Sequence, residues 1–407
     1  MPTPRVTIPL RNQGEIQFVM PEDALPPEHP ARVLWSVISR LDLSAFLADA
    51  GAFEGGSGPP LTSPRMLLTL WTYAISRGVG SAREIERLTR SDAAYRWIVG
   101  DQRPGRTAIT EFRVSHLAAL DELLTNVLAA LIQQGALSIE TVAIDGMRVR
   151  ASASAPSFRR EASLEELREQ AKLHLTAVLA QADDPSLTVR QHAAREAKAR
   201  DFQHRVDAAL DVVAELNANR KPGSKPARAS STDPEARVMK MGDGGFRPGM
   251  NVQMATAGNV MGGPRTIVAV AVTNVGSDMA TLAPMVEQIE RRTGALPEHV
   301  LADANHANHE AISSLVARGV DVLLPVPERT RANGGTPEIQ AWKDRMASSE
   351  AKELYRARAS LCELTNANAR RMGMTQLLVR GAAKATSVAL ITAIAHDLLA
   401  HATTLLA

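Results

Sequence analysis

The first third of the chain carries the hydrophobic spacing of helices. Val33, Val37 and Leu41 recur at helical intervals in HPARVLWSVISRLDLSAFL and therefore share one face. In SPRMLLTLWTYAIS, Ser63 stands at an N-cap position and Pro64 in the first turn, two features that favour the start of a helix. The pattern predicts a helical N-terminal region.

A short basic connector, GDQRPGRTAITEFR, separates these helices from the next one. Ahead of it, SAREIERL opens with Ser81 three residues before Glu84, which is the pattern of a capping box. Within the connector, Pro and Gly precede Thr107 and Thr110, and either threonine can serve as an N-cap. We therefore expect another helix to run through HLAALDELLTNVLAALIQQG and to end near Gly135.

From about residue 140 the pattern changes to that of strands. TVAIDGMRV, MNVQMAT and RTIVAVAVTNV are rich in Val or Ile and are bounded by Gly, Pro or Asn. The two patterns then alternate: a helix at about 279–293, the strand HVLADA, a helix at about 307–318, the strand VDVLLPV and a long helix at about 349–371. This order predicts a mixed α/β layer.

Two charged amphipathic segments interrupt this region after its first strand. SLEELREQAKLHLTAVL has Ser163 and Glu166 in a capping pattern, and VRQHAAREAKARDFQHRVDAALDVVAEL is helical over its whole length. NANRKPGSKPARASSTD follows and has the composition of a linker. We expect a helical insertion and linker at about residues 157–235.

Composition and charge narrow the class of protein. The 407 residues include 46 Lys and Arg against 44 Asp and Glu, so the net charge of +2 gives no global sign of a nucleic-acid partner. Positive charge is nevertheless concentrated in residues 61–120 and 220–265, as binding along a phosphate backbone requires, although solvated helix faces give the same pattern.

The compartment is expected to be the cytoplasm. The single cysteine, Cys362, excludes an internal disulfide and suits a reducing environment. The N-terminus lacks the apolar core of a secretory signal, and the longest nearly apolar stretch, residues 385–395, is too short to span a bilayer. We therefore expect no membrane segment.

Three acidic residues stand where catalytic chemistry is expected. Asp145 and Asp303 each end a hydrophobic strand, where α/β sheets place their ligands. Glu363 lies on the long C-terminal helix in one stripe with Arg356 and Arg370, at spacings of seven residues. A ligand set of carboxylates suits Mg²⁺ or Mn²⁺, and two such ions about 3.5–4 Å apart promote displacement at a phosphodiester.

Each of these acids also has a simpler interpretation. An aspartate at a strand end is commonly a turn or cap residue, and a glutamate among arginines commonly forms a surface ion pair. Other acids compete for the same roles, namely Asp243, Asp278, Glu350 and Glu353.

Two further features have open alternatives. His306 and His309 form an HxxH pair of the kind that can bind zinc, but no third nitrogen or sulfur ligand is apparent, and a cap or a DNA contact accounts for the pair as well. Trp342 precedes the long helix, where it is either a core residue or a platform for base stacking.

Long composite stretches of the chain resemble the DDE transposases of bacterial insertion sequences, over roughly residues 28–400. The N-terminal part resembles that family in SPRMLLTLWTYAISRGVGSAREIERLTRSDAAYRWIVGDQRPGRTAITEFR. The remainder resembles it in VAIDGMRVRASAS, TDPEARVMKMGDGGFRPGMNVQ, VTNVGSDMATLAPMVEQIE, LPEHVLADANH and YRARASLCELTNANARRMGMTQLLVRG.

The resemblance implies a ribonuclease H-like catalytic core behind a helical N-terminal domain. The expected division is an arm at residues 1–28, a helical DNA-binding and assembly domain at 29–137, and a catalytic domain at 138–407 that contains the insertion.

The resemblance also assigns site residues. Asp145, Asp303 and Glu363 are expected to be the catalytic and metal-binding acids, with Mg²⁺ as the cofactor and Mn²⁺ as a substitute. The residues expected to contact DNA are Arg148, Arg150, Arg247, Tyr355, Arg356, Arg358 and Arg370.

The implied reaction is cleavage of the ends of an insertion sequence, followed by joining of the freed 3′ hydroxyls to target DNA. The implied partners are double-stranded transposon ends and target DNA, held by a homodimer at the bacterial nucleoid. The alternative is a catalytically inactive or recruited DNA-binding protein derived from such a transposase. In its favour, Ala304, Asn305 and His306 follow Asp303, where relatives have a glycine and an aromatic residue.

Overall fold

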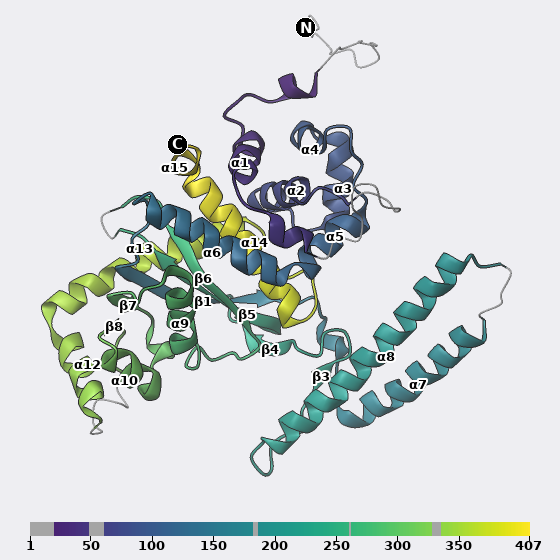
Figure 1. Cartoon of the computed structure of the whole chain (residues 1–407). Helices are drawn as coiled ribbons and strands as arrows, with labels where there is room; N and C mark the ends of the chain where they lie inside the picture. The colour runs from purple at the N-terminus through teal and green to yellow at the C-terminus, as the bar shows by residue number, and fades with distance from the viewer. Residues whose placement is uncertain (1–19, 49–60, 182–185, 260–261, 328–334) are drawn as a thin grey trace, which may run out of the picture.

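The computed structural model describes residues 20–48, 61–181, 186–259, 262–327 and 335–407 (Figure 1). Helices build the N-terminal part, a mixed sheet with flanking helices follows, and a long helical hairpin projects from it (Figure 1). Residues 1–19 of the expected N-terminal arm lie outside the described residues.

Short helices form the N-terminal part, as the hydrophobic spacing predicts. They are η1 (Pro21–Ala24), α1 (Pro30–Ser39), η2 (Ser44–Leu47), α2 (Pro64–Ser76), α3 (Ala82–Ser91), α4 (Ala93–Val99), α5 (Arg106–Ser115) and α6 (Leu117–Gln133). The side chain of Ser63 caps α2 by accepting a hydrogen bond from the backbone N–H of Met66, and Ser81 caps α3 through that of Glu84. Both predicted N-caps are confirmed, but the capping box is incomplete, because the carboxylate of Glu84 accepts hydrogen bonds from Arg87.

The prediction for the connector is wrong in two respects. Gly105, in an extended conformation, is the N-cap of α5, so the helix begins before both Thr107 and Thr110. Glycine is tolerated at an N-cap because that residue lies outside the helical conformation. In addition, the segment up to Gly135 forms two helices, α5 and α6, which meet at His116 with a bend of 69°.

One six-stranded sheet lies at the centre of the C-terminal part. Its strands are β1 (Thr141–Arg150), β4 (Arg237–Lys240), β5 (Phe246–Ala257), β6 (Thr266–Thr273), β7 (His299–Leu301) and β8 (Asp321–Leu323). They are ordered β4-β5-β1-β7-β8, and β6 pairs with β5. β1 is antiparallel to β5 and parallel to β7, so the sheet is mixed, as expected.

The helices of this part pack against the sheet. They are α9 (Leu282–Thr293), α10 (His309–Ala317), α12 (Pro337–Ala347), α13 (Ser349–Arg371), α14 (Ala382–Ala400) and α15 (Ala402–Leu406), with the short η4 (Ala304–His306) after β7. α13 contacts β1 and β5, whereas α9 and α14 contact β6. α13 has the bounds that its sequence pattern predicts.

The predicted insertion is an antiparallel pair of long helices, α7 (Glu161–Ala180) and α8 (Val189–Ala218) (Figure 1). α7 begins at Glu161 and has no side-chain cap, so the predicted cap at Ser163 is wrong. α8 has a capping box of Thr188 and Gln191. η3 (Ala155–Ser157) and the two-stranded ribbon of β2 (Phe158–Arg159) and β3 (Ala229–Ser230) close the base of the hairpin.

α14 is a core helix. By length and apolar composition it is able to cross a bilayer, as is the bent pair α5 and α6 taken as one span, but 67% of its most apolar window is buried inside the protein. Its fully buried Asp397 accepts a hydrogen bond from the backbone N–H of Ile267 at 2.9 Å, which fastens α14 to β6. The apolar stretch noted at 385–395 therefore belongs to the core.

Candidate active site

Asp145 lies within β1, and Asp303 lies two residues past the end of the neighbouring strand β7. β1 and β7 run parallel with Ala143 paired to Leu301, and each aspartate follows its paired residue by two positions. Residues two apart on a strand point to the same face, and neighbouring strands lie about 4.8 Å apart. Ala143 and Leu301 pack with Leu361 of α13, so both carboxylates follow that face of the sheet.

α13 supplies the hydrogen-bond donors for Asp145. A guanidinium N–H of Arg358 donates to Oδ1 at 3.0 Å, and the amide of Asn366 donates to Oδ2 at 2.8 Å. Cys362, on the same helix, is buried among apolar residues, and burial raises the pKa of its thiol to about 12. The thiol is therefore an inert core group, and the helix presents one cation and one amide to the acid.

Asp303 is held by its own loop. Its Oδ1 accepts hydrogen bonds from the backbone N–H of Asn305 at 3.0 Å and from Nδ1 of His306 at 2.7 Å. Its Oδ2 accepts from the side-chain amide of Asn305 at 2.9 Å. The sequence DANH thus forms a tight turn in which Asp303 caps η4.

The two carboxyl groups have opposite pKa shifts. Burial raises the pKa of Asp145, and the negative charge of Asp303 adds to the rise while Arg358 opposes it. Burial alone would also raise the pKa of Asp303, but the hydrogen bond and charge of His306 and the hydrogen bond of Asn305 outweigh it and lower the pKa to about 2. The negative charge of Asp303 thus acts on Asp145, in keeping with the parallel pairing of β1 and β7.

Glu363 lies apart from this pair. It is exposed on α13, whereas Arg358 and Asn366 of the same helix face Asp145. Among the described residues, the oxygens of Asp145, Asp303 and Glu363 do not all lie within 4.8 Å of one another. The structure therefore joins two of the three predicted acids, and the role of Glu363 stays a prediction.

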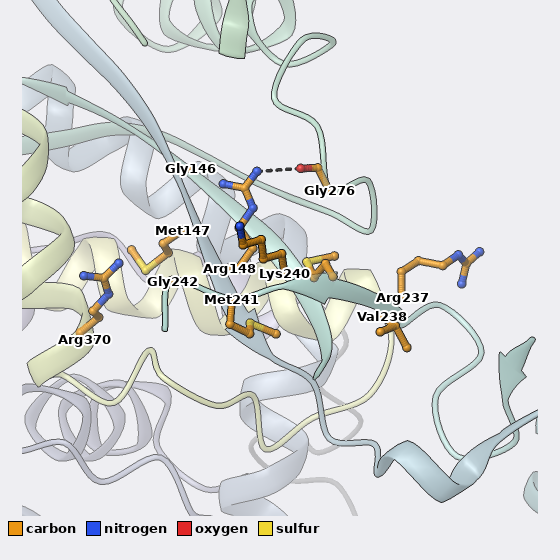
Figure 2. Close-up of a pocket in the computed structure, with 11 residues that line it drawn as sticks. Gly146, Met147, Arg148, Arg237, Val238, Lys240, Met241, Gly242, Gly276 and Arg370 are labelled. Atoms are coloured by element: carbon orange, nitrogen blue, oxygen red, sulfur yellow. Dashed lines mark hydrogen bonds between the residues drawn. The ribbon is translucent and has the colours of Figure 1, made fainter. Parts of the chain in front are cut away.

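A basic cavity of about 470 Å³ lies along β1 at Gly146, Met147 and Arg148, the residues that follow Asp145 (Figure 2). It begins at Gly146, the residue after Asp145, and its described lining contains no acidic side chain. Four cations line it: Arg148, Arg237, Lys240 and Arg370. Arg148 is fixed there by hydrogen bonds to the backbone oxygen of Gly276 at 2.6 Å and to Asp278 at 3.0 Å. This surface suits a polyanion.

The other residues predicted to contact DNA have different surroundings. Arg150 is exposed at the end of β1, and Arg247 is exposed but paired with Asp243. Arg356 is exposed and paired with Glu353. Tyr355 is partly buried, and it lines a second cavity near the end of β8.

Two of the open alternatives are now decided. Trp342 is 1% exposed and lies edge-on against His309, with ring centroids 6.3 Å apart. It is a core residue and presents no surface for base stacking. His306 is fully buried beside Asp303, whereas His309 is exposed and lies against Trp342. The two histidines of the HxxH pair therefore have different surroundings.

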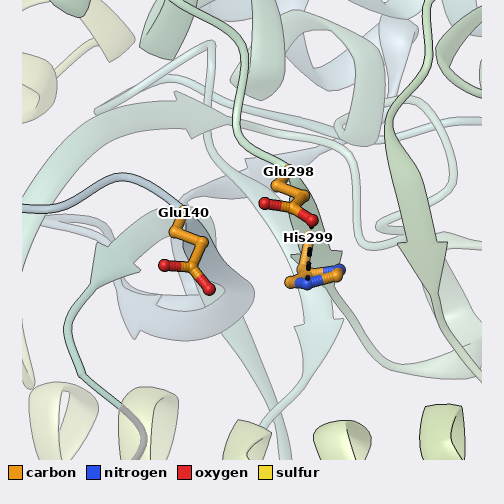
Figure 3. A group of neighbouring side chains, drawn as sticks. All are labelled: Glu140, Glu298 and His299. Atoms are coloured by element: carbon orange, nitrogen blue, oxygen red, sulfur yellow. Dashed lines mark ion pairs between the residues drawn. The ribbon is translucent and has the colours of Figure 1, made fainter.

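A second acidic group lies at the other end of the same strands (Figure 3). Glu140, Glu298 and His299 have potential ligand atoms within 4.8 Å of one another. Glu140 precedes β1 and His299 begins β7, whereas Asp145 and Asp303 follow the paired segment. Both glutamates are exposed, and His299 also lies 3.1 Å from Asp321, so this group is a surface charge cluster separate from the aspartate pair.

The sequence interpretation missed a buried polar cluster beside the pair. Asn251 and Gln253 of β5 both donate to Asp278, and Gln253 also contacts His306. One signal was available, because MNVQMAT places two amides two residues apart and hence on one face of a strand. Asp278 entered only as a competing acid.

Two segments of the chain match known protein families. Residues 19–115 match a transposase domain, and residues 221–398 match the transposase DDE domain. Neither the curated proteins nor the solved structures contain a significant match to the chain.

The two matched segments and the acidic site define a transposase. More narrowly, the chain belongs to the DDE transposases of insertion sequences. The matched DDE segment includes Asp303 and Glu363 but begins after Asp145. The position of Asp145 relative to Asp303 therefore follows only from the pairing of β1 with β7.

Proposed function

We propose that this transposase cleaves the ends of an insertion sequence and joins the freed 3′ hydroxyls to target DNA by metal-dependent phosphoryl transfer. In this proposal Asp145, Asp303 and Glu363 are the catalytic acids of a ribonuclease H-like core at residues 138–407. The observation that carries it is the pairing of β1 with β7, in which Asp145 and Asp303 each follow a paired residue by two positions, and a cavity lined by cations begins at the next residue of β1, Gly146.

The donor set fits a divalent cation. Carboxylate oxygens are the ligands that Mg²⁺ and Mn²⁺ prefer. Burial and the neighbouring charge of Asp303 both disfavour the ionised form of Asp145, and a divalent cation held by the two aspartates would offset both effects. Bound at Asp145 and Asp303, such an ion supplies stabilisation of the charge that develops on the phosphoryl oxygens.

The side chains around the pair have separate tasks. Asn366 fixes the plane of the Asp145 carboxylate by holding Oδ2. Arg358 balances the charge of Asp145 and is within reach of a phosphate that enters the site. The four cations of the basic cavity hold the DNA backbone next to the acids, which sets the position of the scissile bond.

Two displacements follow one another at the same acids. In the first, water attacks the phosphodiester at the element end, the bond from phosphorus to the 3′ oxygen breaks, and a 3′ hydroxyl leaves. In the second, that hydroxyl attacks a phosphodiester of the target, whose own 3′ oxygen leaves. Each step forms one P–O bond and breaks one, so no oxidant or energy source is needed.

The remaining parts of the chain are proposed to bind and assemble DNA. Residues 29–137 form the DNA-binding and assembly domain, and residues 157–235 form the insertion of the catalytic domain. Because two element ends must be joined to one target, the active form is a homodimer on double-stranded DNA, at the nucleoid of the cytoplasm.

A DNA-binding protein without catalysis is the second candidate. The observation in its favour is that Arg358 and Asn366 occupy both oxygens of Asp145 while Glu363 is exposed. In this alternative the cation of Arg358 replaces the metal permanently, and the basic cavity serves binding alone.

An excision assay separates the two candidates. A plasmid that carries the element with its own ends is supplied with the wild-type protein, with Asp145→Asn or with Asp303→Asn. Asp243→Asn is the matched control, because Asp243 is exposed and paired with Arg247. Catalysis predicts excision by the wild type and the control only. Equal, undetectable excision by all four proteins, with DNA binding retained, supports the binding protein.

A further inference from the structure

A buried series of hydrogen bonds connects Asp303 to the basic cavity. We call it the polar relay; it consists of His306, Gln253, Asn251, Asp278 and Arg148. Nδ1 of His306 lies 2.7 Å from Asp303 Oδ1, and Nε2 lies 3.2 Å from Oε1 of Gln253. The amide of Gln253 donates to Asp278 Oδ1 at 2.7 Å, and Asp278 Oδ2 accepts from Arg148 at 3.0 Å.

The chemistry of the partners fixes the direction of each bond. The Asp278 carboxylate only accepts, so Gln253 turns its NH₂ group toward it and its carbonyl oxygen toward His306. Nε2 of His306 therefore lies against this carbonyl oxygen. At the other end the Asp303 carboxylate is also an acceptor, so Nδ1–H is the donor to it. The imidazole ring is held at both nitrogens.

The relay excludes solvent almost completely. His306, Gln253 and Asn251 are fully buried, and the side chain of Asp278 is 2% exposed. Buried polar groups that lose a partner cannot exchange it for water, so a network of this kind has one well-defined arrangement. His306 at one end contacts Asp303, and Arg148 at the other end lines the cavity.

Gly146 makes room for the relay. A Cβ atom at this position would lie 2.2 Å from the Gln253 amide nitrogen, 2.8 Å from Asp278 Oδ1 and 2.9 Å from Asn251 Oδ1. Any larger residue after Asp145 would overlap the relay, which explains the glycine at this position. The relay thus packs against Gly146, which is the neighbour of Asp145 in β1.

We propose that His306 is a positioning residue, which uses Nδ1–H to hold Asp303 in the orientation that binds the divalent cation, with Gln253 and Asp278 fixing the ring from behind. The inference rests on the proposed function, in which Asp303 is a metal ligand. Outer partners that orient a metal ligand commonly contribute about 10–100-fold to metal affinity or activity. His306 acts through Asp303 and touches neither DNA nor metal itself.

Isosteric variants separate the two nitrogens. In the full-length protein, His306→Asn keeps an N–H donor near the position of Nδ1, whereas His306→Gln keeps one near Nε2, and His306→Ala keeps neither. Calorimetry measures the Mn²⁺ affinity of each variant without DNA. The excision rate is also measured as a function of Mg²⁺ concentration, which gives the concentration for half-maximal excision. Thermal unfolding of each variant reports its effect on stability.

The expected result is that His306→Asn binds Mn²⁺ within about threefold of the wild type, while His306→Gln and His306→Ala lose about 10–100-fold. The rate at saturating Mg²⁺ should fall less than the metal affinity does. A purely structural histidine predicts instead that Asn and Gln weaken Mn²⁺ binding equally, in line with their unfolding temperatures.

Different results would overturn the positioning role and the metal site. If the wild type binds Mn²⁺, Asp303→Asn does not, and His306→Ala binds like the wild type, then the positioning role is wrong and the proposed function stands. If the wild type and Asp303→Asn bind Mn²⁺ equally, the metal site is wrong and the positioning role is lost with it.

Discussion

Arg358 donates a hydrogen bond to Oδ1 of Asp145 at 3.0 Å, although the two residues are 213 positions apart in the chain. Their side chains are 17% and 21% exposed, so the pair lies mostly out of solvent. A cation of the protein thus occupies an oxygen of the acid that we propose as a metal ligand. The arginine and a divalent ion compete for this carboxylate.

Removing that arginine should strengthen metal binding. With Arg358→Gln, the repulsion between the guanidinium and an incoming cation disappears and Oδ1 of Asp145 is released. We expect Mn²⁺ affinity without DNA to rise by about tenfold, which corresponds to about 1.4 kcal/mol. Calorimetric titration measures it. Arg356→Gln, on the same helix but exposed and paired with Glu353, should change nothing; weaker binding by Arg358→Gln would contradict the competition.

The two aspartates should affect stability in opposite directions in metal-free protein. The pKa of Asp303 is lowered to about 2 from 3.8, so its ionised form stabilises the fold by about 2 kcal/mol above pH 4. This contribution is lost as the pH falls through 2. Asp303→Asn should therefore lower the free energy of unfolding at pH 7, measured with chelator present. An unchanged free energy of unfolding would show that the hydrogen bond from His306 to Asp303 does not stabilise the fold.

Asp145→Asn should have the reverse effect. Because the pKa of Asp145 is raised in the folded protein, its ionisation costs stability above that pKa. The neutral amide avoids this cost, so the variant should unfold at the same temperature as the wild type or higher at pH 7. The difference should shrink as the pH falls through the raised pKa, where the wild type becomes protonated. A large loss of stability at pH 7 would show that the bond to Arg358 dominates.

Gly146→Ala should disrupt the polar relay. The new methyl group would lie 2.2 Å from Gln253 Nε2 and less than 3 Å from side-chain oxygens of Asp278 and Asn251, so three members of the relay would have to shift. Overpacking of this kind costs about 1–3 kcal/mol, which urea unfolding measures. Gly242→Ala is the control, because a Cβ there meets nothing within 4 Å. Equal stability of the two variants would mean that the relay adapts.

The basic cavity should contribute to the salt dependence of DNA binding. Lys240→Gln and Arg370→Gln each remove a cation from its lining. If each cation contacts a phosphate, the slope of log affinity against log salt should fall by about 1 per variant, for any DNA sequence. Fluorescence anisotropy at several salt concentrations measures the slope. Lys172→Gln on α7, where Lys172 pairs with Glu169, should leave it unchanged; slopes that match this control would place the DNA elsewhere.

The sequence predicted the strands and α13 well, because their hydrophobic patterns are strong and local. It did not predict α14 as a helix, since that segment is apolar on nearly every side and so lacks the periodicity of an amphipathic helix. Asp145 and Asp303 could be selected because each follows a short hydrophobic run, but the expectation that both end a strand is wrong for Asp145, because β1 continues past it to Arg150. Their proximity depends on the parallel pairing of β1 with β7, which the pattern does not specify.

The polar relay was beyond sequence reasoning for a related reason. His306, Gln253 and Asp278 come from three separate segments, and they meet only because β5, β1 and β7 are neighbours in that order. The orientation of α13 is similarly a matter of packing. Burial of Leu361 and Cys362 against the sheet turns Asn366 toward Asp145 and leaves Glu363 exposed.

The most direct test of the account is the location of the metal. Crystals of the protein with Mn²⁺ and a cleaved element end are measured at the manganese absorption edge. The account predicts an anomalous peak bound by the carboxylates of Asp145 and Asp303, with Arg358 displaced from Oδ1. A map with no peak at this pair, or with manganese only at Glu140, Glu298 and His299, would contradict it.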